Sequence, residues 1–287
     1  MQKDPNDFIR DTAELISLPD IYIKVKSVLD DPESSMADLT AVVSFDPALA
    51  ARLLTLANSA FFGFSTKIDT IDRAVNMLGG RQIHDLVLAT TVADAFSKVT
   101  PKSITMHEFW TDSVHCGLLA KTFAKACGLI DADRFFVEGL LYDIGHLILD
   151  QSVPQKCATA FADARDTPRP IQLAEREIIG CDYAEVGAAL MESWHFPGGF
   201  IESVRYQNDP AEAQAFPLDA AILHVSVNLL RADGDDFQAE RVFSELVPFA
   251  VEETGAEADM LNDIVNECAE ELSLTFDMLF PQTRKVA

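Results

Sequence analysis

Tyr142 and Asp143 are the adjacent residues whose chemistry is most open to interpretation. They follow an apolar run that begins near Gly139, and Ile144 and Gly145 come directly after them. A carboxylate in this position can bind a hard metal cation, or it can cap the helix that begins after it. The preceding residue helps to separate these alternatives, because a phenol is a poor substitute for the neutral imidazole that metals commonly use as a nitrogen ligand. The pair therefore favours a helix cap over a metal centre.

Other motifs for enzyme chemistry are absent from the sequence. The six histidines never occur in a His-x-x-x-His arrangement, so no helix face presents two of them at metal-ligand spacing. No Gly-x-Ser-x-Gly nucleophile elbow occurs, and Gly79-Gly80 lacks the lysine and the spacing of a phosphate-binding loop. The five cysteines contain no Cys-x-x-Cys pair, which argues against both a disulfide framework and a zinc knuckle.

Three aromatic residues follow the apolar segment that ends at Asn58, and they form a candidate site of a different kind. Core packing between lobes is the simpler interpretation of such a cluster, and a surface patch that binds a partner protein is the alternative. The three residues are Phe61, Phe62 and Phe64.

The net charge of −24 limits the classes of partner. Nucleic-acid binding depends on Lys and Arg side chains that neutralise phosphates, whereas this chain has 46 acidic and 22 basic residues. An anionic membrane surface would repel the chain for the same reason. Residues 232–287 alone hold 14 acidic and 3 basic residues, so this segment is either a solvated helical surface or a docking surface for a basic protein. We therefore expect neither nucleic acid nor membrane as a partner.

The sequence also predicts a cytoplasmic location. It contains no run of 18 or more apolar residues, which predicts that no segment spans a membrane. The N-terminal segment from Met1 to Asp11 is polar and mixed in charge, unlike the basic-then-apolar layout of a secretory signal.

Helical periodicity extends along the whole chain, without a convincing alternating strand pattern, so the predicted fold class is all-α. Caps predict helix starts at Ser35, at Asp46-Pro47 and at Thr70, and Gly79-Gly80 predicts a helix end. Later helices are predicted over 109–127, 135–142, 155–165, 171–179, 182–194, 198–207, 216–231, 236–253 and 257–279.

The segment 97–105, with Pro101 at its centre, is predicted to be a linker. It divides the chain into an N-terminal helical bundle over 1–98 and a helical lobe over 106–233, and the acidic helices over 234–287 form a C-terminal extension. Two lobes joined in this way can shift relative to each other.

Several of these segments, taken in order, resemble the HDOD (HD-related output domain) family from about Leu18 to about Asp233. In the first lobe the matching segments are Leu18-Pro19, Asp46 to Leu49, Arg52 to Ala60 and Ile71 to Gly79. In the second lobe they are Phe109-Trp110, Gly139 to Gly145, Glu185 to Ala188, Trp194 and Phe196-Pro197. The resemblance implies a helical bundle joined to a degenerate HD-type helical domain, in a family associated with bacterial signal transduction.

The resemblance also implies where the metal ligands of HD-type phosphohydrolases would fall. Those enzymes place His and Asp side chains around metal ions that polarise a phosphate and activate a water molecule. Only Asp143 keeps the expected residue type, so we expect a vestigial site with no catalytic residue, metal or cofactor. Its positions are Asp112, Tyr142, Asp143, Tyr183, Gln207, Asn208 and Val227.

In this interpretation the surviving residues have structural roles. Asp143 caps the helix that follows it, and Gly145 supplies the backbone freedom that the turn needs. Tyr142 fills the vacated pocket, with its hydroxyl bonded to Asp143, Asp112 or Tyr183. His115 and His224 are expected to be core histidines.

The leading hypothesis is a non-catalytic signalling module that acts through protein–protein contact. Its expected partners are signalling proteins, namely a regulator, kinase or cyclase supplied by a separate chain. One alternative is a metal-dependent phosphohydrolase of nucleotides or cyclic dinucleotides, with its metal site rebuilt from Asp112 and Asp143. The other is a module that senses a nucleotide in the vacated pocket without turnover. Basic groups must then lie near the pocket, and the candidates are Lys121, Lys125, Arg134 and Arg205.

Overall fold

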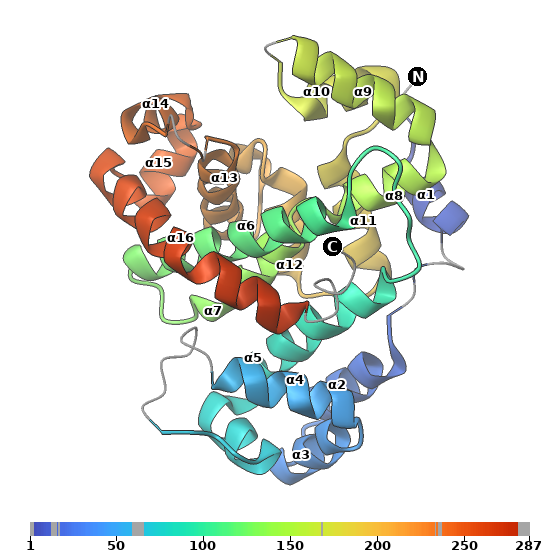
Figure 1. Cartoon of the computed structure of the whole chain (residues 1–287), viewed down its shortest axis with the longest axis vertical. Helices are drawn as coiled ribbons and strands as arrows, with labels where there is room; N and C mark the ends of the chain where they lie inside the picture. The colour runs from blue at the N-terminus through green and yellow to red at the C-terminus, as the bar shows by residue number, and fades with distance from the viewer. Residues whose placement is uncertain are drawn as a thin grey trace. The chain divides into compact units, whose positions relative to one another are not determined.

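The computed structural model describes residues 3–12, 16, 18–58, 66–167, 169–232, 234 and 237–280. The predicted aromatic cluster of Phe61, Phe62 and Phe64 lies outside the described residues. In the described part of the chain every regular element is a helix, which confirms the predicted all-α fold class (Figure 1).

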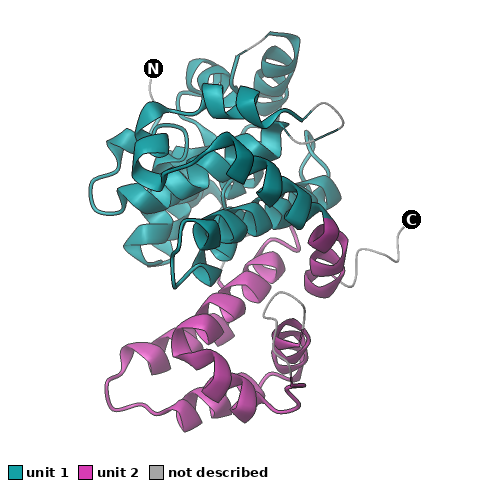
Figure 2. Ribbon diagram, turned by 90° about the vertical axis from the view of Figure 1, so that its left-hand side faces the viewer, with its two compact units in different colours: residues 1–16, 99–269 teal, residues 17–98, 270–287 magenta. Residues whose placement is uncertain are grey.

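The chain forms two compact units (Figure 2). Unit 1 comprises residues 1–16 and 99–269, and unit 2 comprises residues 17–98 and 270–287. The helices of unit 2 are α2 (Asp20–Asp30), α3 (Met36–Ser44), α4 (Pro47–Ala57), α5 (Ile71–Ala95) and the last part of α16 (Ala258–Leu279). Those of unit 1 are α1 (Pro5–Thr12), α6 (Met106–Ala126), α7 (Asp133–Leu140), α8 (Ile144–Ser152), α9 (Pro154–Asp166), α10 (Ile171–Ile178), α11 (Tyr183–Ser193), α12 (Gly198–Tyr206), the short η1 (Pro210–Glu212), α13 (Pro217–Ala232), α14 (Ala239–Glu245), α15 (Pro248–Thr254) and the first part of α16.

Unit 2 has a boundary at residue 98, where the predicted N-terminal lobe ends, but the other boundaries of the two units differ from the predicted ones. α1, which the sequence analysis does not predict, packs against α8 and α11, so the N-terminal residues belong with unit 1. α15 packs against α13, so most of the acidic segment is part of unit 1 rather than a separate extension. Within the predicted linker, the backbone N–H groups of Lys102 and Ser103 donate to the carboxylate of Asp150 at 2.5 and 3.1 Å.

Local capping explains where the helices of unit 2 begin. Ser35 and Asp38 form a reciprocal capping box at the start of α3, and the Asp46 carboxylate accepts from Ala48 N and Leu49 N at the start of α4. Thr70 caps α5 in the same way. The three predicted helix starts are therefore confirmed. The predicted break at Gly79-Gly80 is a kink inside α5, where Gly79 has a φ of 80° and non-helical backbone.

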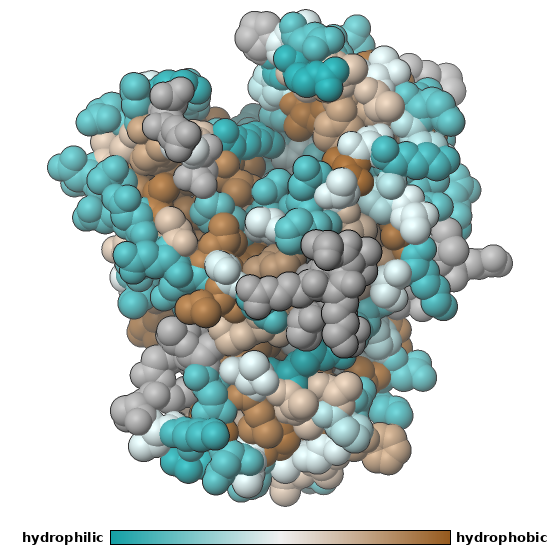
Figure 3. Space-filling model, viewed as in Figure 1, coloured by the Kyte–Doolittle hydropathy of each residue, from teal (hydrophilic) through white to brown (hydrophobic). Residues whose placement is uncertain are grey.

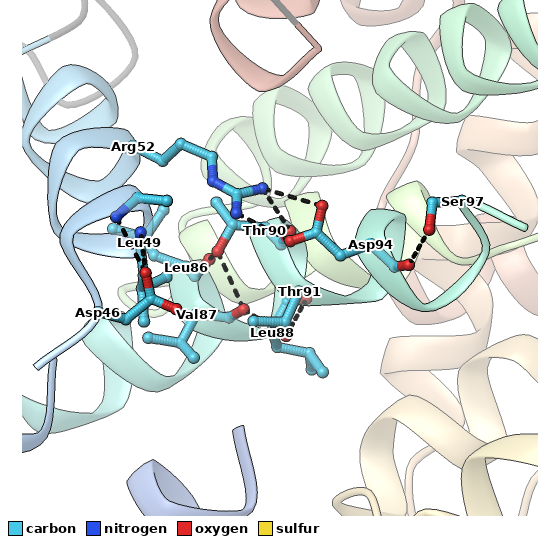
Figure 4. Close-up of polar contacts among 11 residues, drawn as sticks. Asp46, Leu49, Arg52, Leu86, Val87, Leu88, Thr90, Thr91, Asp94 and Ser97 are labelled. Carbon is cyan, nitrogen blue, oxygen red and sulfur yellow. Dashed lines mark hydrogen bonds and ion pairs between the residues drawn. The ribbon is translucent and has the colours of Figure 1, made fainter. Parts of the chain in front are cut away.

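Arg52 joins α4 to α5 within unit 2 (Figure 4). Its guanidinium donates to the Asp94 carboxylate at 2.8 and 3.3 Å and to the Thr90 carbonyl at 3.2 Å. The pair is half-exposed, so it contributes no more than about 1 kcal/mol. Most of the stability of this unit must come from buried apolar side chains, among them Leu39, Val43, Leu53, Leu56, Val75, Val87 and Leu88.

In unit 1, α6 and α7 cross closely because each contributes a glycine at the crossing. A Cβ atom on Gly117 would lie 2.6 Å from the Phe136 carbonyl oxygen, and one on Gly139 would lie 2.6 Å from the Cys116 carbonyl oxygen. This crossing aims the C-terminal end of α7 at the site described below. The single helix predicted over 236–253 is wrong, because α14 ends at Glu245 and Pro248 starts α15.

No single helix among the described residues is long and apolar enough to cross a membrane. α3 and α4 meet the length and composition requirement only as a pair, and they are bent by 115° where they join.

Candidate functional site

The positions predicted to correspond to HD metal ligands all lie in unit 1, on five of its segments. They are Asp112 on α6, Tyr142 and Asp143 between α7 and α8, Tyr183 at the start of α11, Gln207 and Asn208 after α12, and Val227 on α13.

Gln207 connects three of these segments. Its Nε2 donates to the Tyr142 carbonyl at 2.7 Å, and its Oε1 accepts from the Tyr183 hydroxyl at 3.3 Å. Gln207 is 1% exposed and Tyr183 is fully buried, so both bonds are made away from water, where polar groups need partners. Val227 is buried as well, but its side chain offers no polar atom to the group.

Asp143 does not cap α8 with its side chain, so the predicted cap is wrong. The residue occupies the N-cap position, but its carboxylate makes no cap hydrogen bond to the helix backbone. Its Oδ2 instead pairs with Nδ1 of His146 at 3.2 Å. The backbone conformation of Asp143, with φ −121° and ψ 19°, differs from the extended geometry of the other capping residues, and the side chain therefore turns toward the imidazole.

His146 is the centre of the site. Its Nε2 lies 3.1 Å from Oε1 of Glu175, so the ring is held between two carboxylates. One face of the imidazole ring stacks on the Tyr183 ring, and the two ring centroids are 4.2 Å apart. Burial alone would lower the pKa of His146, but Glu175 and Asp143 outweigh it and raise the pKa to about 10. The imidazole is therefore protonated at neutral pH and has no lone pair for a metal.

Glu175 belongs to the site although no motif in the sequence points to it. It lies on α10, is fully buried, and its Oε2 accepts the backbone N–H of Tyr183 at 2.9 Å. Its carboxylate therefore positions Tyr183 as well as His146. α10 is amphipathic, with Ala174 and Glu175 on its buried face, and a charged residue on such a face is the signal that the sequence offers.

Gly145 is required for a reason different from the predicted turn geometry. Its φ is not in the left-handed region. A Cβ atom at this position would lie 1.9 Å from the Tyr183 carbonyl oxygen and 2.7 Å from Gly187 N. The glycine therefore allows α8 and α11 to approach each other, and this approach brings His146 onto Tyr183.

Both tyrosines remain protonated phenols. Burial raises the pKa of Tyr142 well above its usual range, and Asp143 raises it further. Burial also raises the pKa of Tyr183, although Arg231 opposes the shift. The predicted bond from the Tyr142 hydroxyl to Asp143, Asp112 or Tyr183 is wrong, because this hydroxyl has no hydrogen-bond partner among the described residues.

Arg231 brings a cation to the site. Its Nη2 donates to the Tyr183 hydroxyl at 2.8 Å, from a position one turn beyond Val227 on α13. The buried Cys116 thiol lies within electrostatic reach of Arg231, Asp143 and Asp112, since burial raises the pKa of Cys116 and these three charges shift it further. The bond to Tyr183 places the guanidinium beside one of the predicted HD positions.

The basic residues predicted to bind a nucleotide are mostly paired elsewhere. Arg134 binds Asp219 with two hydrogen bonds of 2.5 Å and Glu138 at 3.0 Å. Lys121 pairs with Asp133 at 2.8 Å, Arg205 pairs with Glu192 at 2.9 Å, and Lys125 is an exposed residue at the end of α6.

These side chains do not fit an HD metal centre. Within the described ranges, no group of three or more His, Cys, Asp or Glu side chains is arranged to hold a metal ion. Asp112 and Asp143 lie close enough that burial and the Asp143 charge raise the pKa of Asp112 to about 6. However, the His146 imidazole is paired with two carboxylates, and Arg231 brings a positive charge to Tyr183.

The fold and site define a helical protein with a degenerate HD-type site. Residues 15–210 match the family described as HDOD domain, which covers more than half of the sequence. The chain therefore belongs to the HDOD family, as its sequence motifs predict.

Solved structures with the same fold include three that cover nearly the whole chain. A protein from Shewanella amazonensis SB2B, whose name proposes a phosphohydrolase, is 26% identical with a TM-score of 0.73, over 95% of this chain and 96% of that one. An HDOD domain protein from Geobacter sulfurreducens is 20% identical with a TM-score of 0.72, over 96% of each chain. A protein from Marinobacter aquaeolei VT8, whose name proposes a role in signal transduction, is 22% identical with a TM-score of 0.70, over 97% of this chain and 62% of that one.

An uncharacterized protein from Treponema pallidum (strain Nichols) is 24% identical over 226 residues. The match covers 77% of this chain but only 43% of that relative, so the relative is much longer than the matching region.

Proposed function

We propose that this chain is a non-catalytic signal-transduction module that acts by binding other proteins. The observation that carries the proposal is the polar network at the positions of the HD metal ligands. There His146 is held by Asp143 and Glu175, and the Tyr183 hydroxyl is held by Arg231. Polar groups that bond to one another fix the packing of the helices, and among the described residues no group of three or more His, Cys, Asp or Glu side chains is arranged to hold a metal ion.

The names of the structural neighbours point in two directions. One proposes signal transduction and one proposes a phosphohydrolase. The protonated imidazole and the missing ligands favour the first role for this chain, because metal-assisted hydrolysis needs a metal-bound water as its nucleophile.

The starts of α14 and α16 offer a surface for a basic partner. They flank a groove of about 580 Å³ whose lining includes the exposed carboxylates of Glu240, Asp259 and Asp263. In Figure 3 the surface over α14 and the first turns of α16, at the upper left, is largely hydrophilic. Three carboxylates around one groove favour a Lys- or Arg-rich segment of a partner, such as a regulator, kinase or cyclase on a separate chain.

The first test concerns catalysis. We expect the purified chain to contain no stoichiometric metal by mass spectrometry and to release no heat on titration with Mn²⁺ or Mg²⁺. We also expect no hydrolysis of nucleotides or cyclic dinucleotides with either ion present. Hydrolysis that disappears in Asp143→Ala but persists in Asp209→Ala, an exposed carboxylate, would contradict the proposal and support a phosphohydrolase.

The second test concerns the acidic groove. Deletion of the C-terminal helices is unsuitable, because Ala250, Leu261 and Ile264 are buried there. A partner captured by cross-linking in cells that express the chain should instead be purified and titrated against the double variant Asp259→Asn, Asp263→Asn. We expect the double variant to bind the partner more weakly than the wild type does, with an affinity that depends less on salt concentration. The control variant Glu252→Gln, on α15, should bind as the wild type does. Equal binding by all three proteins would remove the groove from the proposal.

A further inference from the structure

Three polar atoms at the site make neither a hydrogen bond nor an ion pair with another described residue. Oδ1 of Asp143 and Nδ2 of Asn208 are buried without one, and the hydroxyl of the buried Tyr142 also lacks one. Buried polar groups are nearly always paired in a folded protein, with protein atoms, water or a ligand. Two buried atoms of this kind, Oδ1 of Asp143 and Nδ2 of Asn208, therefore need an explanation.

These groups surround a single phenol oxygen. The Tyr183 hydroxyl donates to Oδ1 of Asn208 at 3.3 Å and accepts from Nη2 of Arg231 at 2.8 Å. The side-chain amide of Asn208, through its oxygen, and the guanidinium of Arg231 therefore both hydrogen-bond to the Tyr183 hydroxyl. Gln207 joins Tyr142 to the same phenol, because its Nε2 donates to the Tyr142 carbonyl and its Oε1 accepts from the Tyr183 hydroxyl.

Arg231 has hydrogen-bonding capacity to spare. A guanidinium carries five N–H donors, and within the described part of the chain one bond to Tyr183 is made. Arg231 is exposed and Asn208 is half-buried, so a solute can reach the guanidinium beside the Asn208 amide. Cation, amide and phenol together are donors, which suit the oxygen atoms of an anion.

The acidic groups beside them limit the charge of that anion. Asp143 directly follows Tyr142, and Asp112 lies close enough to Asp143 for the two charges to interact, so both carboxylates repel an anion bound there. A singly charged group is therefore favoured over a dianion. The unpaired Oδ1 of Asp143 is an acceptor, which suits a hydroxyl or amino group adjacent to the anion.

We propose that Arg231, Asn208, Tyr142 and Asp143 bind a small singly charged oxyanion that carries a neighbouring hydrogen-bond donor, with the guanidinium in the place of a metal. A phosphodiester beside a sugar hydroxyl and a carboxylate beside a hydroxyl both have this chemistry. The inference goes beyond the proposed function, because ligand binding is measured without any partner protein.

Direct binding tests the proposal. The probes are 3′,5′-cyclic adenosine monophosphate as the phosphodiester, lactate as the hydroxycarboxylate, and sulfate as the dianion, each titrated into the full chain by NMR in the presence of a chelator. We expect saturable binding of at least one monoanion, stronger than that of sulfate. No saturation by either monoanion, or stronger binding of sulfate, overturns the proposal.

Variants assign the binding to this site. Arg231→Gln should weaken binding of the monoanion about tenfold or more, because it removes a charge-assisted hydrogen bond. Arg241→Gln, which alters an exposed arginine paired with Glu245, should leave the affinity unchanged. Tyr142→Phe removes one hydroxyl only and decides the question if Arg231→Gln does not fold. Equal affinity in the wild type and in whichever of these variants folds contradicts the proposal.

Discussion

His146 stacks on Tyr183, with ring centroids 4.2 Å apart and ring planes inclined by 20°. The same imidazole bridges Asp143 and Glu175, so α8, α10 and α11 meet at one protonated ring. A cation over the face of a phenol ring adds attraction to the two ion pairs. The Asp-Ile-Gly turn is thereby joined to two later helices through side chains rather than through a metal.

Removal of this imidazole should destabilise the chain strongly. His146→Ala leaves the buried Glu175 carboxylate without its counter-charge, and breaking a buried pair in this way costs about 3–5 kcal/mol. Urea denaturation followed by circular dichroism at pH 7 gives the loss. Adding Glu175→Gln to the His146→Ala chain should recover part of it, because the amide carries no charge. Strictly additive losses in this double-mutant cycle would show that the two residues are not coupled.

The same ring predicts how stability depends on pH. The pKa of His146 in the folded chain is about 10, above the value of about 6.5 for an unperturbed imidazole. The groups that face the ring are Asp143, Glu175 and the phenol of Tyr183. Because the folded state binds the proton more tightly, the stabilisation is complete below about pH 6.5 and is lost as the pH rises through about 10.

Denaturation of the wild type and of His146→Gln at several pH values between 7 and 10 tests whether the stability falls as the pH rises. The free energy of unfolding of the wild type should fall more steeply with pH, whereas groups common to both chains affect both curves equally. Parallel curves would mean that His146 does not hold its proton in the folded state.

The helices could be predicted because their signals are local. Ser35, Asp46 and Thr70 cap helices as expected, since each cap is determined by residues within one turn. Pro248 carries the same kind of signal inside the segment 236–253. α1 is short and polar on average, and it is stabilised by contacts with α8 and α11 that no local pattern contains.

The site could be predicted only in part, because its partners come from distant helices. The family resemblance points to Tyr142, Asp143 and Tyr183, but nothing in the sequence links them to Glu175 on α10. Arg231 could have been predicted from the sequence, since it lies one helical turn after Val227 and must share the same face of α13. The predicted role of Gly145 failed for a related reason, because the atoms that exclude a side chain there belong to α11.

Asp112→Asn should stabilise the chain at neutral pH. Burial and the carboxylates of Asp143 and Glu108 raise the pKa of Asp112 to about 6, so the folded state favours the protonated acid. A carboxyl group whose pKa is higher in the folded state than in the unfolded state destabilises the fold when the pH exceeds both pKa values. The side-chain amide of asparagine stays neutral, so the variant avoids this loss of stability. The side chain is only partly desolvated and much of the residue still contacts water, so solvent screening keeps the gain small.

Thermal unfolding at pH 7 in the presence of a chelator measures this effect, with Asp209→Asn as the control for a change in net charge. The expected result is a higher midpoint for Asp112→Asn than for the control. If Mn²⁺ stabilises the wild type and not Asp112→Asn, the carboxylate is a metal ligand and the interpretation of the site is wrong.

Gly145→Ala should be the most damaging small substitution at the site. The added methyl group would lie 1.9 Å from the backbone oxygen of Tyr183, which cannot move without separating α8 from α11. We expect a loss of at least about 3 kcal/mol, at the upper end for overpacking. Gly187→Ala on α11 is the matched control, because its nearest neighbour, at 3.3 Å, is a Val204 methyl group that can shift. Urea denaturation compares the two variants, and the near-ultraviolet circular dichroism of Gly145→Ala should also lose the signal of the stacked Tyr183. Similar losses in the two variants would mean that the approach of α8 to α11 does not determine the geometry of the site.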